Sequence, residues 1–348
     1  MAGDTWPTVL QVVLGRCRLS NRVRDDNDAM NSTHLLPSGA CRLPFWGVMR
    51  ASGADAVSFL HSQLSNDVTR LDTGHARLAA YCNAQGRMLA SLLYAKRSAE
   101  EVWLLCSADL LPVTLKRLSM FVLRAKARLS DASGELAVLG LAGQAGADWL
   151  GADAPAGAWD KSERDGAMHV RLPDVAGVPR WLWIGPAAAA EAVLQALPVV
   201  AESDWQWLDV SAGIAPVVAA TSGQFVPQML NYELVGGVDF KKGCYPGQEV
   251  VARSQYLGKL KRRAFLLASD VPAQPAQEVF WSGDTGQPAG QVAWSATAPD
   301  GSHLALAELK IGVIGSGSLH LGSGQGPQLR VQPLPYALPH EASSGEAA

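Results

Sequence analysis

Cysteine is sparse in this sequence, and the cysteines follow no pairing pattern. There are five, an odd number, and no two of them form a Cys-x-x-Cys motif: Cys17, Cys41, Cys82, Cys106 and Cys244. A disulfide framework and a structural zinc site are both disfavoured for this reason. The seven histidines are scattered and form no His-Glu-x-x-His motif, so we expect no metal site. This use of cysteine fits a reducing cytoplasm.

Other familiar motifs are also absent. The sequence has no Walker A loop, no Gly-x-Gly-x-x-Gly segment and no serine nucleophile elbow. These absences remove the usual sequence support for nucleotide binding and for a serine hydrolase. No apolar run reaches the length of a membrane span, and the run over 9–14 is too short for a signal-peptide core. We therefore expect a cytoplasmic protein with no membrane partner.

An excess of positive charge is missing too. Lysine and arginine number 29 and aspartate and glutamate 32, so the formal net charge is −3. No global field attracts nucleic acid, and direct tRNA binding is disfavoured. Locally the balance reverses, because residues 241–263 hold seven basic side chains and only Glu249 as an acid. Such a run is usually a solvated face, and an anionic ligand is the alternative.

The chain contains enough apolar residues for more than one core. It has 348 residues, of which 48% are hydrophobic and 18% charged, so two or three globular domains are expected. Residues 1–32 lack periodicity and predict a disordered or partly ordered extension. The authentic start is either Met1 or Met30. An arginine-rich transit peptide is disfavoured by the acidic residues between 25 and 28. Residues 337–348 are expected to form a flexible tail.

Strands and helices alternate over residues 33–258, which indicates an α+β fold with antiparallel strands. Residues 83–86, Asn-Ala-Gln-Gly, are typical of a hairpin turn. Ser52 is predicted to cap the first helix. Strands are predicted over 45–49, 78–82, 88–94, 101–106, 136–141, 170–172 and 181–184, and helices over 54–64, 109–121 and 187–197. After 259 only short strands separated by Gly, Pro and Asp remain, so residues 259–336 predict a small β-barrel or sandwich.

Tryptophan is abundant, with eleven in the chain. Two pairs are spaced by two residues, Trp181 with Trp183 and Trp205 with Trp207. In a strand this spacing directs both rings to one side. The composition favours a role in the core over a stacking platform for a flat heterocycle.

The densest cluster of special residues is Lys-Lys-Gly-Cys-Tyr-Pro-Gly-Gln-Glu at 241–249. A helix is predicted from Pro246 to about Tyr256, ended by Gly258. Cys244 then precedes a helix N-terminus with two lysines nearby, which favours a thiolate. The alternative is a tight turn with a buried structural cysteine. A hydrolase dyad with histidine is disfavoured, because nothing in the sequence places a histidine near Cys244.

The run at 242–249 resembles the Lys-Gly-Cys-Tyr-x-Gly-Gln-Glu signature of the YgfZ family, folate-binding proteins related to the glycine-cleavage T-protein (aminomethyltransferase). Further matches occur at 64–68, 81–88, 222–228 and 333–336, so the resemblance covers about residues 40–336. It implies a T-protein-like fold. In that fold, two intertwined α+β subdomains over 33–258 and a C-terminal β-barrel over 259–336 surround a central cavity.

The resemblance also implies a ligand and a pathway. The ligand is a folate, tetrahydrofolate or another form, and the partners are iron–sulfur enzymes or cluster-assembly proteins, including the radical enzymes that thiomethylate tRNA. Trp46 and Trp205 match the tryptophans proposed to contact folate in the family, and Cys244 matches the family cysteine, a candidate reactive residue. Lys242, Tyr245, Gln248 and Glu249 belong to the same signature and are predicted to contribute to cofactor binding.

One departure from the T-protein bears on catalysis. Its paired aspartates, which follow a glycine, are replaced here by Ala90 and Ser91. Neither side chain can act as a carboxylate does in proton transfer or in stabilising a cation. The resemblance therefore favours an accessory protein over an aminomethyltransferase. A folate-dependent one-carbon transferase or demethylase that uses other acid and base groups is the alternative.

Overall fold

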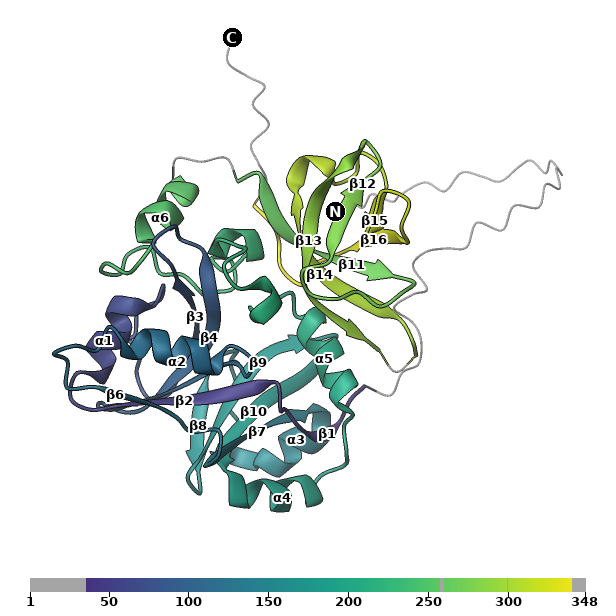
Figure 1. Ribbon diagram of the computed structural model, residues 1–348. Coiled ribbons are helices and arrows are strands. Elements are labelled where there is room, and N and C mark those ends of the chain that lie inside the picture. The colour runs from purple at the N-terminus through teal and green to yellow at the C-terminus, as the bar shows by residue number, and fades with distance from the viewer. Residues whose placement is uncertain (1–35, 257–259, 299, 340–348) are drawn as a thin grey trace, which may run out of the picture. The chain divides into compact units, whose positions relative to one another are not determined.

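The computed structural model describes residues 36–256, 260–298 and 300–339, which form two five-stranded antiparallel sheets and a closed barrel (Figure 1). The predicted extension over 1–32 lies outside the described residues, as do Cys17, Met30, Gly258 and most of the predicted tail. The α+β prediction is confirmed. Among the described helices, none is long and apolar enough to cross a membrane.

The first sheet has the strand order β3-β4-β5-β2-β6 and carries the predicted hairpin. Asn83 closes that turn, since its Oδ1 accepts from the backbone N–H groups of Gln85 and Arg87, each at 3.0 Å. Leu60 of α1 and Leu118 of α2 are fully buried in the core beside the sheet. The elements are β2 Trp46–Ser52, α1 Ala56–Gln63, β3 Ala76–Cys82, β4 Met88–Ser98, β5 Glu101–Ser107, α2 Leu111–Ser119 and β6 Arg128–Asp131.

The start of α1 differs from the prediction. Ser52 does not cap the helix, because it is the last residue of β2. Asp55 occupies the N-cap position, but its carboxylate accepts a hydrogen bond from the backbone N–H of Lys126 at 2.7 Å. The helix is therefore anchored to a distant segment of the chain instead of being capped locally.

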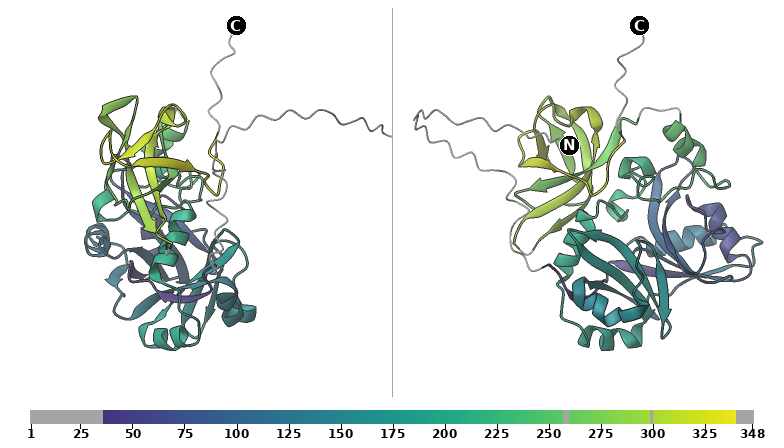
Figure 2. Two further views of the ribbon diagram at one scale, coloured as in Figure 1. Left: turned by 90° about the vertical axis from the view of Figure 1, so that its right-hand side faces the viewer. Right: turned by 180° about the vertical axis from the view of Figure 1, so that it is seen from behind.

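The second sheet has the order β1-β7-β10-β9-β8, and α3 and α4 pack against it (Figures 1 and 2). Trp181 and Trp183 are two residues apart on β10, so their rings point to the same side of the sheet. Both rings are buried in the core that these helices cover, which confirms the predicted core role of this pair. The elements are β1 Gly39–Arg42, β7 Leu136–Ala142, α3 Gly143–Leu150, η2 Gly151–Asp153, β8 Lys161–Arg164, β9 Ala167–Val175, β10 Val178–Pro186 and α4 Ala187–Gln195.

A common core joins the two sheets. Val48 and Leu105 from the first sheet, Val138 and Val170 from the second, and Trp205 from α5 belong to one buried cluster. Burial of such apolar side chains stabilises the fold by roughly 1.5–3 kcal/mol each. The two sheets therefore share their interior and enclose the cavity described below.

Trp205 and Trp207 lie on a helix, α5 (Glu202–Ser211), and not on a strand. Glu202 and Asp204 in its first turn suit the positive end of the helix dipole. Residues two apart on a helix point about 200° apart, so the two rings face different sides. The strand geometry that would direct both rings to one side does not apply to this pair.

The C-terminal barrel is closed and has the strand order β11-β14-β13-β12-β15-β16 (Figure 1). The short strands predicted after residue 259, over 264–268, 278–281, 290–294, 303–308 and 328–331, are all present, and β15 is an addition that the sequence pattern did not reveal. The elements are β11 Arg262–Ser269, β12 Glu278–Trp281, β13 Asp284–Thr297, β14 His303–Lys310, η5 Ile311–Val313, β15 Leu319–Leu321 and β16 Gln328–Gln332.

Two short 3₁₀ helices, η3 (Ala219–Thr221) and η4 (Pro227–Leu230), precede the loop at 241–249, and the last two residues of the loop begin α6 (Gln248–Tyr256). The helix begins two residues later than predicted, because Gly247 has φ +79°, a left-handed conformation. A Cβ at this position would collide with the backbone of Asn83 and Gly86. The glycine thus lets the loop pack closely on the β3–β4 hairpin.

Candidate functional site

A small cavity of about 60 Å³ lies among residues of both sheets, the segment after α5 and the barrel. Its walls are mainly aromatic and aliphatic, with three polar side chains, Ser91, Arg180 and Asp209. The aromatic residues of the wall are Phe45, Trp46, Trp159, Tyr232 and Trp294. Apolar walls with a few convergent polar groups are typical of small-molecule sites.

Trp46 begins β2 and is half-buried in this wall. Its ring contacts Phe45 edge to face, with the ring centroids 5.0 Å apart, and Phe45 in turn contacts Trp294 of the barrel at 4.9 Å. The predicted ligand residue Trp46 is therefore placed where it can contact a molecule in the cavity.

Arg180 and Asp209 form an ion pair at the cavity wall. The Arg180 guanidinium donates from Nη1 to Asp209 Oδ1 at 2.6 Å and from Nε to the Pro173 carbonyl at 3.0 Å. Burial raises the pKa of Asp209, and Arg180 opposes this shift. An ion pair is an unusual feature beside an apolar cavity. Titratable groups with perturbed pKa values in clefts are candidates for functional residues. The sequence reasoning did not identify either residue.

Trp205 lies behind this pair. Its side chain is buried against Gly140, where a Cβ would collide with the indole, and the Arg180 guanidinium lies 5.7 Å from the ring centroid. Among the described residues, Trp205 is not one that lines the cavity. In this conformation it supports Arg180, and its contact with a ligand stays a prediction.

A second, more open cavity of about 650 Å³ adjoins the first, because Leu78 and Trp159 line both. Its polar side chains include Arg77, Asp239 and Lys241. A volume of this size falls within the range of roughly 300–1,000 Å³ usual for ligand pockets, whereas the first cavity alone is smaller. Together the two cavities offer an apolar chamber and a polar approach.

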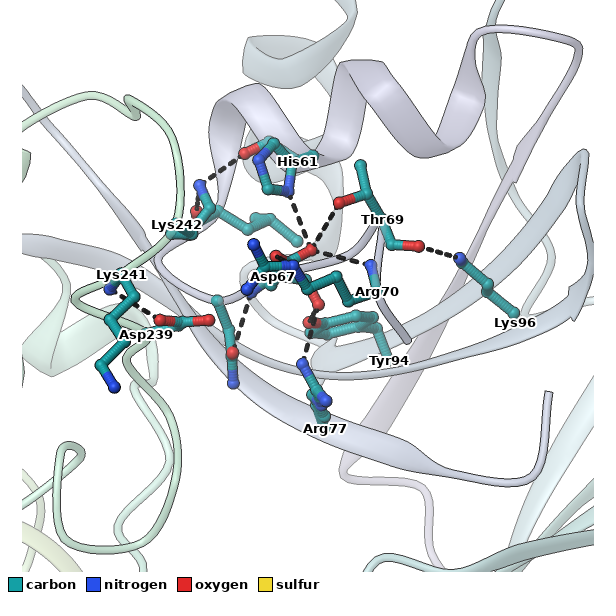
Figure 3. Close-up of polar contacts among 12 residues, drawn as sticks. His61, Asp67, Thr69, Arg70, Arg77, Tyr94, Lys96, Asp239, Lys241 and Lys242 are labelled. Atoms are coloured by element: carbon teal, nitrogen blue, oxygen red, sulfur yellow. Dashed lines mark hydrogen bonds and ion pairs between the residues drawn. The ribbon is translucent and has the colours of Figure 1, made fainter. Parts of the chain in front are cut away.

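Lys242 is buried and bound to backbone. Its Nζ donates to the carbonyls of His61 at 2.6 Å and Leu64 at 2.8 Å, at the C-terminal end of α1 (Figure 3). It also lies 4.7 Å from the centroid of the Tyr245 ring. Burial lowers the pKa of Lys242 to about 8. The predicted ligand contact of Lys242 is untested, and its visible role is to hold the loop on α1.

The rest of the cysteine loop, residues 241–249, has mixed exposure. Tyr245 is buried, and burial raises the pKa of its hydroxyl. Gln248 is half-buried and Glu249 and Cys244 are exposed. The predicted alternative of a buried structural cysteine is therefore wrong for Cys244. Cys41, Cys82 and Cys106 are buried, and burial raises the pKa of each thiol to about 12.

The structure divides the predicted site residues into two regions. Trp46 lines the small cavity, while the five predicted residues of the cysteine loop, from Lys242 to Glu249, line neither of the two cavities described above. Lys241, the first residue of the loop, reaches the open cavity. No group of three or more His, Cys, Asp or Glu in the described part of the chain is placed to hold a metal ion.

The segment Ser65–Asp67 connects these regions. Ser65 Oγ donates to the Gly237 carbonyl at 2.6 Å, and Asn66 Nδ2 donates to the carbonyls of Leu78 and Gly236 at 2.8 and 2.7 Å. The Asp67 carbonyl accepts from Tyr94 Oη at 3.1 Å (Figure 3). This segment, one of the matched sequence motifs, thus holds the chain that leads into the cysteine loop.

Comparisons with known proteins establish the family. No protein-family model matches the chain. A protein of Sodalis glossinidius (strain morsitans) named tRNA-modifying protein YgfZ is 31% identical over 326 residues, covering 88% of this chain and 95% of that protein. Its namesake in Serratia proteamaculans (strain 568) is 32% identical over 323 residues, covering 89% and 96%. The chain belongs to the YgfZ family.

A solved structure confirms the T-protein-like fold expected of a YgfZ protein. The glycine cleavage system aminomethyltransferase T from Bartonella henselae superimposes with a TM-score of 0.68, covering 86% of this chain and 87% of that chain, at 16% identity. In this YgfZ chain, Ala90 and Ser91 lie on β4, and Ser91 Oγ accepts from the Val217 N–H at 2.8 Å. Ser91 therefore faces the cavity with a hydroxyl already engaged by backbone.

Proposed function

We propose that this protein binds a folate, tetrahydrofolate in the first instance, and acts as an accessory protein for iron–sulfur enzymes of tRNA modification. The observation that carries the folate proposal is the aromatic cavity that holds Trp46 and the Arg180–Asp209 pair. Its relatives' name, tRNA-modifying protein YgfZ, supports the pathway.

The chemistry of a pterin suits this cavity. A pterin is a flat heterocycle with hydrogen-bond donors and acceptors along its edges, so it stacks on aromatic rings and binds paired polar groups. Trp46 and Trp159 provide rings, and Asp209 and Arg180 provide an acceptor and donors. The chamber is small, so binding requires the half-buried Trp46 or Trp159 to move.

The folate tail would occupy the open cavity. Leu78 and Trp159 mark the junction, and beyond them Arg77 and Lys241 supply positive charge for the glutamate carboxylates. This arrangement is consistent with the prediction that basic residues near the cysteine loop bind an anionic ligand.

Calorimetric titration with tetrahydrofolate tests the proposal. Trp46→Ala should weaken binding about 5- to 150-fold, since stacking of a base on an aromatic side chain contributes roughly 1–3 kcal/mol. Trp281→Ala in the barrel is the matched control and should leave the affinity unchanged, because Trp281 lines neither of the cavities described above. Equal affinities of wild type and Trp46→Ala would remove this cavity as the folate site.

A second candidate function is a folate-dependent one-carbon transferase, and Asp209 is the observation that favours it. A carboxylate whose pKa is raised by burial can serve as a general acid or base. Turnover of methylene- or formyl-tetrahydrofolate by the purified protein, lost in Asp209→Asn, would support the enzyme. Binding of these folates without turnover would instead favour the role of an accessory protein.

A further inference from the structure

Helix α2 and the loop after it expose apolar side chains. α2 lies beside β6, the edge strand of the first sheet (Figure 1). Its inner face is buried in the core, whereas four apolar side chains of the helix and loop are 46–87% exposed: Val113, Met120, Phe121 and Leu123. Val113 and Met120 are seven residues apart, which places them on one face of the helix.

The loop holds these side chains in a fixed conformation. The backbone N–H of Phe121 donates to the Leu118 carbonyl at 3.0 Å, and that of Asp55 donates to the Lys126 carbonyl at 3.1 Å. Leu123, the most exposed of the four, has φ +39°, a left-handed conformation that leucine rarely adopts. The fold therefore bears a conformational cost at Leu123 without burying its side chain. A surface that is ordered in advance loses less entropy when a partner binds.

The charged side chains of this segment are all basic. Residues 110–130 contain five of the 29 lysine and arginine residues of the chain and none of its 32 acidic residues. None of the five forms an ion pair with another described residue. Four of them are exposed: Lys116, Arg124, Lys126 and Arg128. We call these four residues and the four exposed apolar residues the α2 patch.

We propose that the α2 patch is the docking surface for an acidic region of the iron–sulfur enzyme that this protein serves, an inference that rests on the proposed accessory role. Apolar side chains of the enzyme cover Met120, Phe121 and Leu123, and its aspartate and glutamate side chains pair with the basic residues. The α2 patch lines neither of the cavities described above, so a docked enzyme leaves both cavities free for a folate.

The chemistry of the α2 patch favours a protein over other occupants. Three of its four apolar side chains are aliphatic, whereas unpaired RNA bases stack mainly on aromatic side chains and arginine. A second copy in a two-fold dimer would place the patch against itself and bring like charges together. A helix that lies on a membrane buries its apolar face in lipid, but the inner apolar face of α2 is already buried in the core.

Binding of a purified radical enzyme that thiomethylates tRNA, measured by biolayer interferometry, tests the docking surface. Leu123→Asn removes the most exposed apolar side chain of the patch, and asparagine tolerates the left-handed conformation, so this variant should fold as wild type does. Its affinity for the enzyme should fall roughly tenfold or more, the loss expected when one leucine is no longer buried. Val199→Asn is the matched control, since Val199 is 90% exposed outside the patch, and should bind as wild type does.

A charge variant examines the basic part of the α2 patch. Arg124→Gln should weaken binding by about two- to fivefold and make it less sensitive to sodium chloride, because one fewer charge is screened. Arg42→Gln, at an exposed arginine of β1, is the control and should change neither quantity. Unchanged enzyme binding in both Leu123→Asn and Arg124→Gln would overturn the proposal, and so would a wild type that does not bind the enzyme.

Further measurements on the same proteins separate the alternatives. Leu123→Asn should bind tetrahydrofolate as wild type does and should support less thiomethylation of tRNA. If Leu123→Asn abolished binding to purified tRNA or to vesicles of anionic lipid, or dissociated a wild-type dimer, while enzyme binding stayed unchanged, the patch would belong to that occupant and the proposal would be overturned. Full thiomethylation without the wild-type protein would instead overturn the accessory role on which the proposal rests.

Discussion

The small cavity and the cysteine loop are built in opposite ways. The cavity draws Trp46, Arg180, Asp209 and Trp294 from both sheets, α5 and the barrel, so these four residues are far apart in the sequence. The loop is one continuous stretch, residues 241–249, held by Lys242 on the end of α1. The cavity thus depends on the whole fold, while the loop depends on a few local anchors. Substitutions can separate the two regions.

The largest effect is expected at the cavity. Arg180→Met removes the partner of Asp209 and leaves a largely buried carboxylate unpaired, which should lower the free energy of unfolding by about 3 kcal/mol. Urea denaturation at pH 7 measures the loss. The double variant Arg180→Met with Asp209→Leu should recover much of it, because no charge is then left buried.

A surface ion pair provides the control for this experiment. Arg330 and Asp270 are both exposed in the barrel, with Nη2 and Oδ1 2.7 Å apart, so Arg330→Met should change stability little. If Arg180→Met lowered the free energy of unfolding as little as Arg330→Met does, the ion pair at the cavity wall would contribute no more to stability than a solvent-exposed ion pair.

A smaller, pH-dependent effect is expected beside the loop. Burial alone would raise the pKa of Asp67, but hydrogen bonds from Thr69 Oγ1 at 2.7 Å and from the backbone N–H of Arg70 at 2.9 Å lower it to about 2 in the folded protein. Its ordinary value is 3.8, so its contribution is complete above about pH 5 and is lost as the pH falls through 2. A shift of this size corresponds to about 2 kcal/mol. The stability difference between wild type and Asp67→Asn, measured by urea denaturation, should therefore shrink from pH 6 to pH 2.

The exposed Asp148 of α3 supplies the matched comparison. Its carboxylate accepts from Gln144 Nε2 at 2.7 Å on the helix surface, so Asp148→Asn removes an exposed carboxylate and should change stability little at pH 6. A stability difference for Asp67→Asn that stays the same between pH 6 and pH 2 would mean that the buried hydrogen bonds to its carboxylate do not favour the ionised form.

The same contrast explains what could be predicted from the sequence. Gly247 and Pro246 marked the loop correctly to within two residues, because turn chemistry and helix starts are local. Trp205 was harder to place, since a pair of tryptophans two apart fits a strand until the helical repeat of Trp205 with Leu208 is given weight.

Contacts between distant segments were beyond such reasoning. The pairing of Arg180 with Asp209 joins β10 to α5, and no local pattern in either segment indicates a partner. The nearness of His61 to Gly243 likewise depends on how α1 packs against the cysteine loop. A faint signal was present for Arg180, a charged side chain in a strand that is otherwise largely buried, which calls for a partner.

The smallest effect, and the sharpest separation of the two regions, is expected from Cys244→Ala. Cys244 is exposed and lines neither of the cavities described above, so the affinity for tetrahydrofolate should stay within about twofold of wild type by calorimetry. The support of a thiomethylating enzyme, measured as thiomethylated tRNA by mass spectrometry, should fall. Trp46→Ala should show the opposite pattern, in which the affinity for tetrahydrofolate is the quantity that falls most directly. A large loss of folate affinity in Cys244→Ala would show instead that the loop and the cavity form one ligand site, because an exposed thiol outside the cavity can affect stacking on Trp46 only through such a connection.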